Sequence, residues 1–132
     1  MERRVVNPWP WSLDFGFQQA IETTHATKTL YCSGQTAANA KGELQAPGDM
    51  ERQLLLCWEN LEVLLRESGY GPEDIVRLTL YVTDMDRFMG GAYTPLAKRM
   101  AASHVQTAMT AVGVDRLAFE GQMCEIEATA TR

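Results

Sequence analysis

An amphipathic helix followed by an alternating strand is the feature that most restricts the fold of this chain. Between Asp49 and Ser68, apolar side chains recur at helical spacing and form one broad stripe: Met50, Leu54, Cys57, Trp58, Leu61, Leu64 and Leu65. Asp49 is suited to cap the first turn, and Gly69 to end the helix. From Ile75 to Val82, apolar and polar residues alternate as in a strand. A helix of about twenty residues leading into such a strand predicts a right-handed β-α-β crossover.

The remaining segments favour strands and one further helix. We expect the first two strands to pair as a hairpin, because both are rich in aromatic or β-branched residues. The order β-β-α-β-α-β-β predicts an α+β fold, a single sheet with both helices on one face. The segments, in order, are strands Gly16–Ile21 and Lys28–Ser33, a long loop over 34–48, the helix and strand above, a second helix over Tyr93–Ser103, and strands Thr107–Val114 and Met123–Ala130.

The chain of 132 residues is expected to form a single domain over residues 1–132. Residues 1–15 are expected to be an extended N-terminal segment. Pro8 and Pro10 exclude a helix interior or a central strand there, because proline lacks the backbone donor and fixes φ. The indoles of Trp9 and Trp11 are predicted to cover apolar surface, with ligand stacking as the alternative.

Charge and cysteine usage exclude several classes of function. The chain has 17 acidic and 12 basic residues, a net charge of −5, which argues against a nucleic-acid binder. Its apolar runs are too short to cross a membrane. Three widely spaced cysteines and two histidines form no metal-site pattern, so we expect no metal and no cofactor. Unpaired thiols are typical of a cytoplasmic protein.

Few residues carry readable chemistry. Ser33 ends a strand beside Gly34, where it can contact a ligand or simply form a turn. Glu125 and Glu127 lie on the same face of one strand, about 7 Å apart. Each is a candidate general acid or base, and the alternative is a solvated or ion-paired strand face. His25 and His104 have no recognisable partner.

Taken together, these segments resemble the Rid family (reactive intermediate deaminases), also called YjgF or L-PSP endoribonucleases. The resemblance covers Phe17 to Ala130. It is carried by Cys32-Ser-Gly-Gln-Thr36, Gly42, Gln53, Gly69, Asp74-Ile-Val76, Tyr81-Val-Thr-Asp-Met85, Phe88, Val112, Val114, Leu117 and Glu125-Ile-Glu127. The resemblance implies a chorismate-mutase-like fold that forms a homotrimer through the free sheet face, with small-molecule clefts between subunits. It also implies hydrolysis of imines and enamines such as 2-aminoacrylate, without metal or cofactor.

The chain departs from this family at the position where the family has its substrate-binding arginine. Alignment through Val112–Leu117 places Met109 where the family has an arginine that clamps the substrate carboxylate, a geometry that only guanidinium supplies well. Phe17 stands where tyrosine is common. Ala92 stands where asparagine is common, and Ala111 where many members have cysteine.

The resemblance therefore implies an altered site. It assigns Glu125 as the catalytic residue that positions water, and Ser33, Phe17, Met109, Ala111 and Val112 as substrate-binding residues. Losing the arginine removes charge-assisted hydrogen bonds, so we expect poor hydrolysis of 2-aminoacrylate and 2-iminopropionate. The apolar cleft suits a neutral or aromatic ligand. The alternatives are a non-catalytic trimer that binds a small molecule and, less favoured by the net charge, an endoribonuclease.

Overall fold

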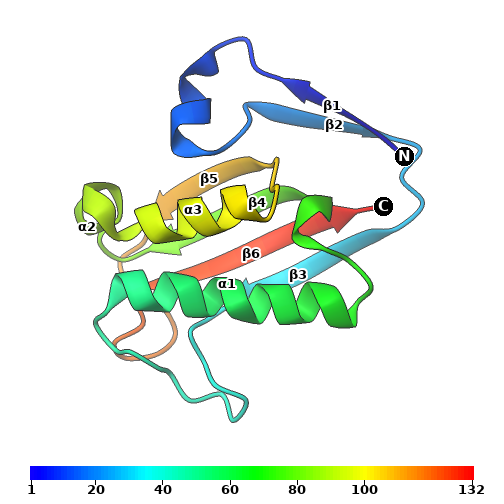
Figure 1. Cartoon of the computed structure of the whole chain (residues 1–132). Helices are drawn as coiled ribbons and strands as arrows, with labels where there is room; N and C mark the ends of the chain where they lie inside the picture. The colour runs from blue at the N-terminus through cyan, green and yellow to red at the C-terminus, as the bar shows by residue number, and fades with distance from the viewer.

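The computed structural model describes residues 1–132 and contains a four-stranded mixed sheet with two helices on one face (Figure 1). The strand order is β3-β6-β4-β5, with β4 and β5 parallel and the other neighbours antiparallel. The strands are β3 (Thr29–Gln35), β4 (Ile75–Val82), β5 (Ala108–Gly113) and β6 (Cys124–Thr131). The predicted α+β class is confirmed.

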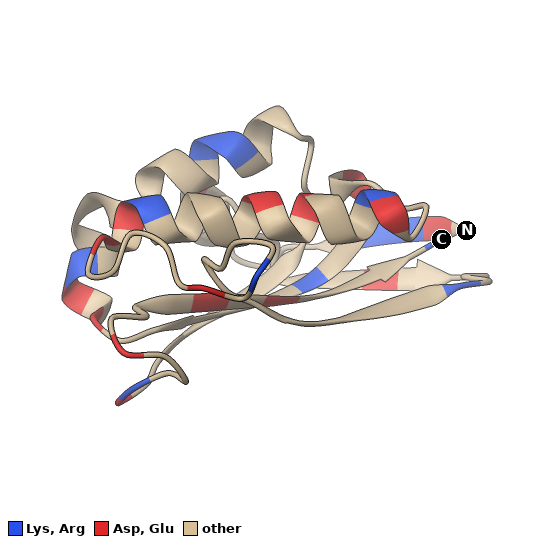
Figure 2. Ribbon diagram, turned by 90° about the horizontal axis from the view of Figure 1, so that it is seen from below, with Lys and Arg blue, Asp and Glu red and all other residues tan.

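Both helices lie on the same side of the sheet, and the opposite sheet face carries no helix (Figure 2). Helix α1 spans Met50–Glu67 and helix α3 spans Thr94–Ala102. The side chain of Asp49 accepts a hydrogen bond from the Arg52 N–H, and Gly69 has a φ of 79°. The predicted ends of the long helix are therefore confirmed, since glycine adopts this left-handed conformation without a steric penalty.

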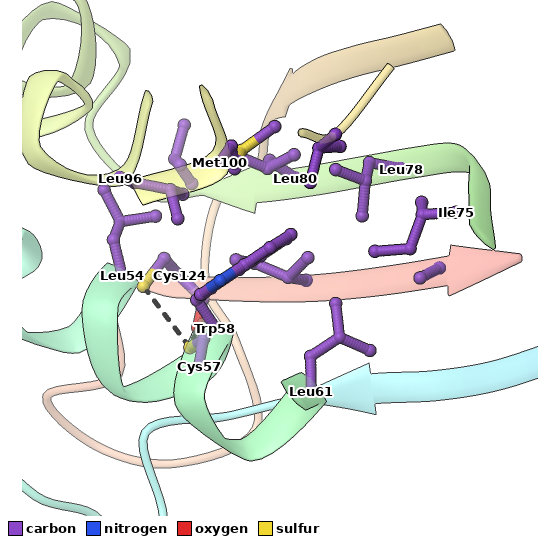
Figure 3. Close-up of a cluster of buried hydrophobic side chains, with 14 of the residues drawn as sticks. Leu54, Cys57, Trp58, Leu61, Ile75, Leu78, Leu80, Leu96, Met100 and Cys124 are labelled. Atoms are coloured by element: carbon purple, nitrogen blue, oxygen red, sulfur yellow. Dashed lines mark hydrogen bonds between the residues drawn. The ribbon is translucent and has the colours of Figure 1, made fainter. Parts of the chain in front are cut away.

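The core lies between the sheet and α1 and α3 (Figure 3). Leu54, Trp58 and Leu61 of α1 are completely buried. They face strand residues that are also completely buried: Ile75, Leu78 and Leu80 of β4, and Cys124 and Ile126 of β6. The alternation predicted for β4 thus divides its side chains between this core and the open face of the sheet.

The expected N-terminal hairpin is wrong. Strand β2 (Ala20–Thr24) pairs with β1 (Glu2–Val6), whereas β3 pairs with β6. The two predicted strands therefore belong to different sheets, since β1 and β2 form a two-stranded sheet apart from the four-stranded one, instead of the single sheet expected. Alternation shows that a segment is a strand, but hydrogen-bond partners distant in the sequence decide its place in a sheet. Within residues 1–15, β1 is followed by a 3₁₀ turn, η1 (Pro10–Phe15).

Short helical turns connect the larger elements. They are η2 (Pro72–Asp74), α2 (Met85–Arg87) and the π-type turn η3 (Phe88–Ala92). Asp84 caps α2, because its side chain accepts a hydrogen bond from the Arg87 N–H. None of the helices combines the length and the apolar character that a membrane-spanning helix requires.

Candidate functional site

The open face of the sheet carries the two glutamates of β6. Glu125 pairs with Tyr81 and Glu127 with Thr79 of β4, so these side chains alternate with the buried ones. The Tyr81 hydroxyl donates a hydrogen bond of 2.8 Å to Oε1 of Glu127. That bond, followed by burial and the nearby carboxylates, raises the pKa of Tyr81. Glu127 is thus held by a neighbour, which leaves Glu125 as the carboxylate available for chemistry.

Gly34 provides the surface on which the Glu125 side chain rests. The β3–β6 register shifts between Cys32 and Gln35, so Ser33 and Gly34 lie in an irregular part of the strand. A Cβ atom at Gly34 would lie 2.6 Å from the carboxyl carbon of Glu125, closer than any real contact. Glycine thus leaves room for the Glu125 carboxylate, which any larger residue at position 34 would displace. The exposed Ser33 is therefore next to the residue that contacts Glu125.

Met109 belongs to a different part of the molecule. It pairs with Leu78 of β4 and packs against the core, on the helix-covered face of the sheet. Its sulfur lies 3.9 Å from the Tyr93 hydroxyl, which also donates a hydrogen bond of 2.9 Å to the Phe15 carbonyl. Ala111 pairs with the buried Leu80 and packs on the same core. This half of the candidate site is apolar apart from one phenol.

An aromatic cluster from the N-terminal segment adjoins this apolar half. Phe17 contacts Trp11 edge to face, with ring centroids 5.9 Å apart, and Trp11 contacts Phe15 in the same way at 6.2 Å. The Gln18 N–H donates a hydrogen bond of 2.8 Å to the Thr107 carbonyl, at the start of β5. That bond places Phe17 beside the strand that carries Met109.

The predicted site residues therefore form two groups within one chain. Val112 pairs with Tyr81 and shares the open face with Glu125 and Ser33. Met109 and Ala111 lie on the helix-covered face, with Phe17 beside the same strand. A cation at position 109 would not neighbour Glu125 of the same chain. Arg116 follows the end of β5 in a loop, where it is exposed.

A buried glutamine supports the strand that carries Glu125, a role that the sequence pattern did not indicate. Gln53 is completely buried in α1. Its side-chain nitrogen donates hydrogen bonds of 2.9 Å to the carbonyls of Ala46 and Gly121, and its oxygen accepts one of 2.8 Å from the Met123 N–H. The sequence feature that could have indicated this role is the amide side chain of Gln53 among the apolar positions of the helix. No comparable signal in the sequence indicated the contacts of Gly34 with Glu125 and of Tyr93 with Met109.

The cysteines pack in the interior. Cys32, Cys57 and Cys124 are all free and buried, and the Sγ atoms of Cys57 and Cys124 lie 3.8 Å apart. Burial raises the pKa of Cys32, and the hydrogen bond with Cys124, followed by burial, raises that of Cys57. Raised thiol pKa values disfavour the reactive thiolate, in agreement with a packing role.

We expect Tyr93 to make the stability of the protein depend on pH in strong base. Burial raises the pKa of its hydroxyl to about 12, above the value near 10 of an unfolded chain. The unfolded state loses this proton first, so stability falls as pH rises from about 10 to 12 and is unaffected by this group below that window. Urea unfolding across this range should show a smaller loss for Tyr93→Phe than for wild type. Equal losses in Tyr93→Phe and in wild type would contradict the assignment.

Comparison with known proteins identifies the same family over most of the chain. The model of the family described as endoribonuclease L-PSP matches residues 15–132. Protein mmf2, mitochondrial, of Schizosaccharomyces pombe is 33% identical over 131 residues, 98% of each chain. A RutC family protein of Aquifex aeolicus is 30% identical over 118 residues, 88% of each. The crystal structure of the Rid family protein YyfB from Yersinia pestis, a protein of unknown function, has a TM-score of 0.89 at 36% identity and covers all of both chains.

Proposed function

The chain belongs to the endoribonuclease L-PSP family, also called Rid or YjgF, and from that premise we propose that it is a homotrimeric hydrolase of neutral imines or enamines. The observation that carries the proposal is the apolar surroundings of Met109, which is packed against the core and touched by the Tyr93 hydroxyl. A substrate carboxylate finds no cation there. A neutral substrate needs none.

A complete site is proposed to require two copies of the chain. Glu125 and Met109 lie on opposite faces of one sheet, so a cleft that uses both takes one from each subunit. The open sheet face is the proposed contact surface, and Tyr31 on that face is 80% exposed, an unusual state for a tyrosine in a strand. Such assembly is expected of a surface that no helix covers.

The proposed reaction is the addition of water to a C=N bond. Glu125 accepts a proton from a water molecule while the water oxygen bonds to the imine carbon, and the nitrogen takes up a proton. The C–N bond of the resulting carbinolamine then breaks. The nitrogen takes up a second proton, the hydroxyl group loses its proton as the carbonyl forms, and the nitrogen leaves as ammonia, so that both protons of the water end on the nitrogen. Imine and water thus become a carbonyl compound and ammonia. Ser33 and the backbone of Val112 are proposed to hold the polar atoms of the substrate.

The protein is also proposed to reside in the cytoplasm. Its three cysteines are all free and buried in the fold. Free thiols are typical of a reducing compartment. Fractionation of cells that express the tagged protein tests this location. Recovery of the tagged protein in an organelle fraction would contradict it.

Two imines separate a neutral from a carboxylate substrate. An amine oxidase converts benzylamine to benzaldimine, and an amino-acid oxidase converts alanine to 2-iminopropionate. Semicarbazide traps the free imine, so hydrolysis by the protein lowers the rate of trapping. We expect the protein to hydrolyse benzaldimine at least about 10-fold more efficiently than 2-iminopropionate, because the charge-assisted hydrogen bonds to a carboxylate are missing. Equal efficiency on both would contradict the proposal.

Met109→Arg is expected to restore the missing interaction. Charge-assisted hydrogen bonds contribute about 1.5–3 kcal/mol, so kcat/KM for 2-iminopropionate should rise roughly 10- to 100-fold. Met89→Arg adds the same charge at a methionine that is 56% exposed and should change little. A similar gain in both variants would indicate a general effect of charge. If the protein binds benzaldimine but does not accelerate its hydrolysis above the uncatalysed rate, the protein is a binding protein and not an enzyme.

A further inference from the structure

We propose that Trp11 determines specificity by stacking on the ring of an aromatic imine bound at the apolar half of the site. The inference rests on the proposed function, because that function provides the imine and the cleft. It adds a residue from the N-terminal segment and a substrate class, the imines of aromatic aldehydes and ketones.

The indole of Trp11 is connected to the site and is still accessible. Its ring meets Phe17 at an interplanar angle of 81° and Phe15 at 80°, so both neighbours contact it edge to face. The residue nevertheless remains 55% exposed, and Phe15 is 42% exposed. Part of the indole surface is therefore free for a planar group. Aromatic pairs of this kind contribute more than the area they bury.

The turn that carries Trp11 is held at both ends. Pro10 opens η1 and fixes φ, and Gly16 closes it with a φ of 80°. The Gly16 N–H donates to the Leu13 carbonyl and the Phe17 N–H to the Ser12 carbonyl. The Tyr93 hydroxyl donates a hydrogen bond to the Phe15 carbonyl and also contacts the sulfur of Met109, so it connects the turn to the strand that carries Met109. A preorganised indole loses little conformational entropy when a ligand binds.

The chemistry around Trp11 selects a neutral aromatic group. The side chains that join it to the site are the rings of Phe15, Phe17 and Tyr93 and the thioether of Met109. The one charged residue within the turn is the acidic Asp14, and the basic Lys98 lines a neighbouring pocket with Asp14 and Phe15 in which Trp11 takes no part. Planar rings match perpendicular aromatic neighbours better than flexible alkyl chains do.

Trp9 supplies a matched control. It is 62% exposed and lies in the same segment, but the aromatic contacts of the chain include Trp11 and not Trp9. One amine oxidase can produce benzaldimine from benzylamine and an aliphatic imine from pentylamine. Trp11→Leu should lower kcat/KM for benzaldimine about 5-fold and leave the aliphatic imine within about 2-fold. Trp9→Leu should leave both substrates unchanged. An equal loss on both imines in Trp11→Leu, or the same selective loss in Trp9→Leu, overturns the inference.

A second readout does not depend on catalysis. The three tryptophans should give three indole N–H resonances in NMR spectra, and the resonance absent from the Trp11→Leu spectrum is that of Trp11. Titration with benzamide should shift the Trp11 resonance, whereas cyclohexanecarboxamide should shift it much less. If neither imine is hydrolysed but the benzamide shift is present, the proposed function fails and the aromatic site stands. If benzamide does not shift Trp11, or if Trp11→Leu changes the mass of the assembly in light scattering, the residue has another role and the inference is wrong.

Discussion

Gly34→Ala is expected to reduce imine hydrolysis by at least about 100-fold while the protein stays folded. The new methyl group would occupy the position of the Glu125 carboxylate, whose carbon lies 2.6 Å from an added Cβ. The carboxylate is the end of a flexible side chain, so it can move away at little cost in stability. A displaced general base no longer reaches the attacking water, and positioned bases contribute roughly 10²- to 10⁴-fold to such reactions.

Two further variants show whether a loss of activity in Gly34→Ala comes from the displacement of Glu125. Gly90→Ala adds the same methyl group where no atom lies within 4 Å, and it should retain the activity of wild type. Glu125→Gln should lose about as much activity as Gly34→Ala, and the double variant should lose little more, because both changes remove the same group. The measurement is kcat/KM for benzaldimine, with circular dichroism as the test of folding. A fully active Gly34→Ala protein would exclude Glu125 as the base.

Gln53→Leu is expected to lower the free energy of unfolding by about 3 kcal/mol or more. The side chain of Gln53 satisfies the carbonyls of Ala46 and Gly121 and the N–H of Met123. Leucine has a similar volume but leaves these part-buried groups without a side-chain partner, and an unsatisfied group costs about 1–3 kcal/mol where it is shielded from water. The loss should appear as a lower urea midpoint at an unchanged slope.

Gln45→Leu is the matched control for this loss. The Gln45 amide makes one hydrogen bond, to the Glu43 carbonyl at an exposed position, so its replacement should change stability by about 0.5 kcal/mol or less. All proteins should be compared at one concentration, because assembly adds to apparent stability. A loss below about 1 kcal/mol for Gln53→Leu would show that water replaces the amide.

The sequence predicted the elements whose signals are local. The stripe of α1 and the alternation of β4 follow from side-chain periodicity, and Asp49 and Gly69 define helix ends by conformations available to single residues. The hairpin prediction was wrong because strand pairing is not a local property. Whether β3 pairs with β2 or with β6 depends on residues about a hundred positions away, and propensity carries no information about that choice.

For the candidate site, the sequence predicted residue types and the tertiary structure decided their neighbours. Alternation alone placed Glu125 and Glu127 on one strand face, and Ser33 beside a glycine. It could not show that Gly34 contacts Glu125, because that contact lies where the pairing register of β3 with β6 shifts. Nor could it show that Met109 lies on the other face, because the register of β5 on β4 sets that position. Periodicity is a property of a segment, whereas faces and contacts arise only when segments pair. The chain by itself thus determined its family and its fold class, and the folded sheet decided that Met109 and Glu125 lie on opposite faces.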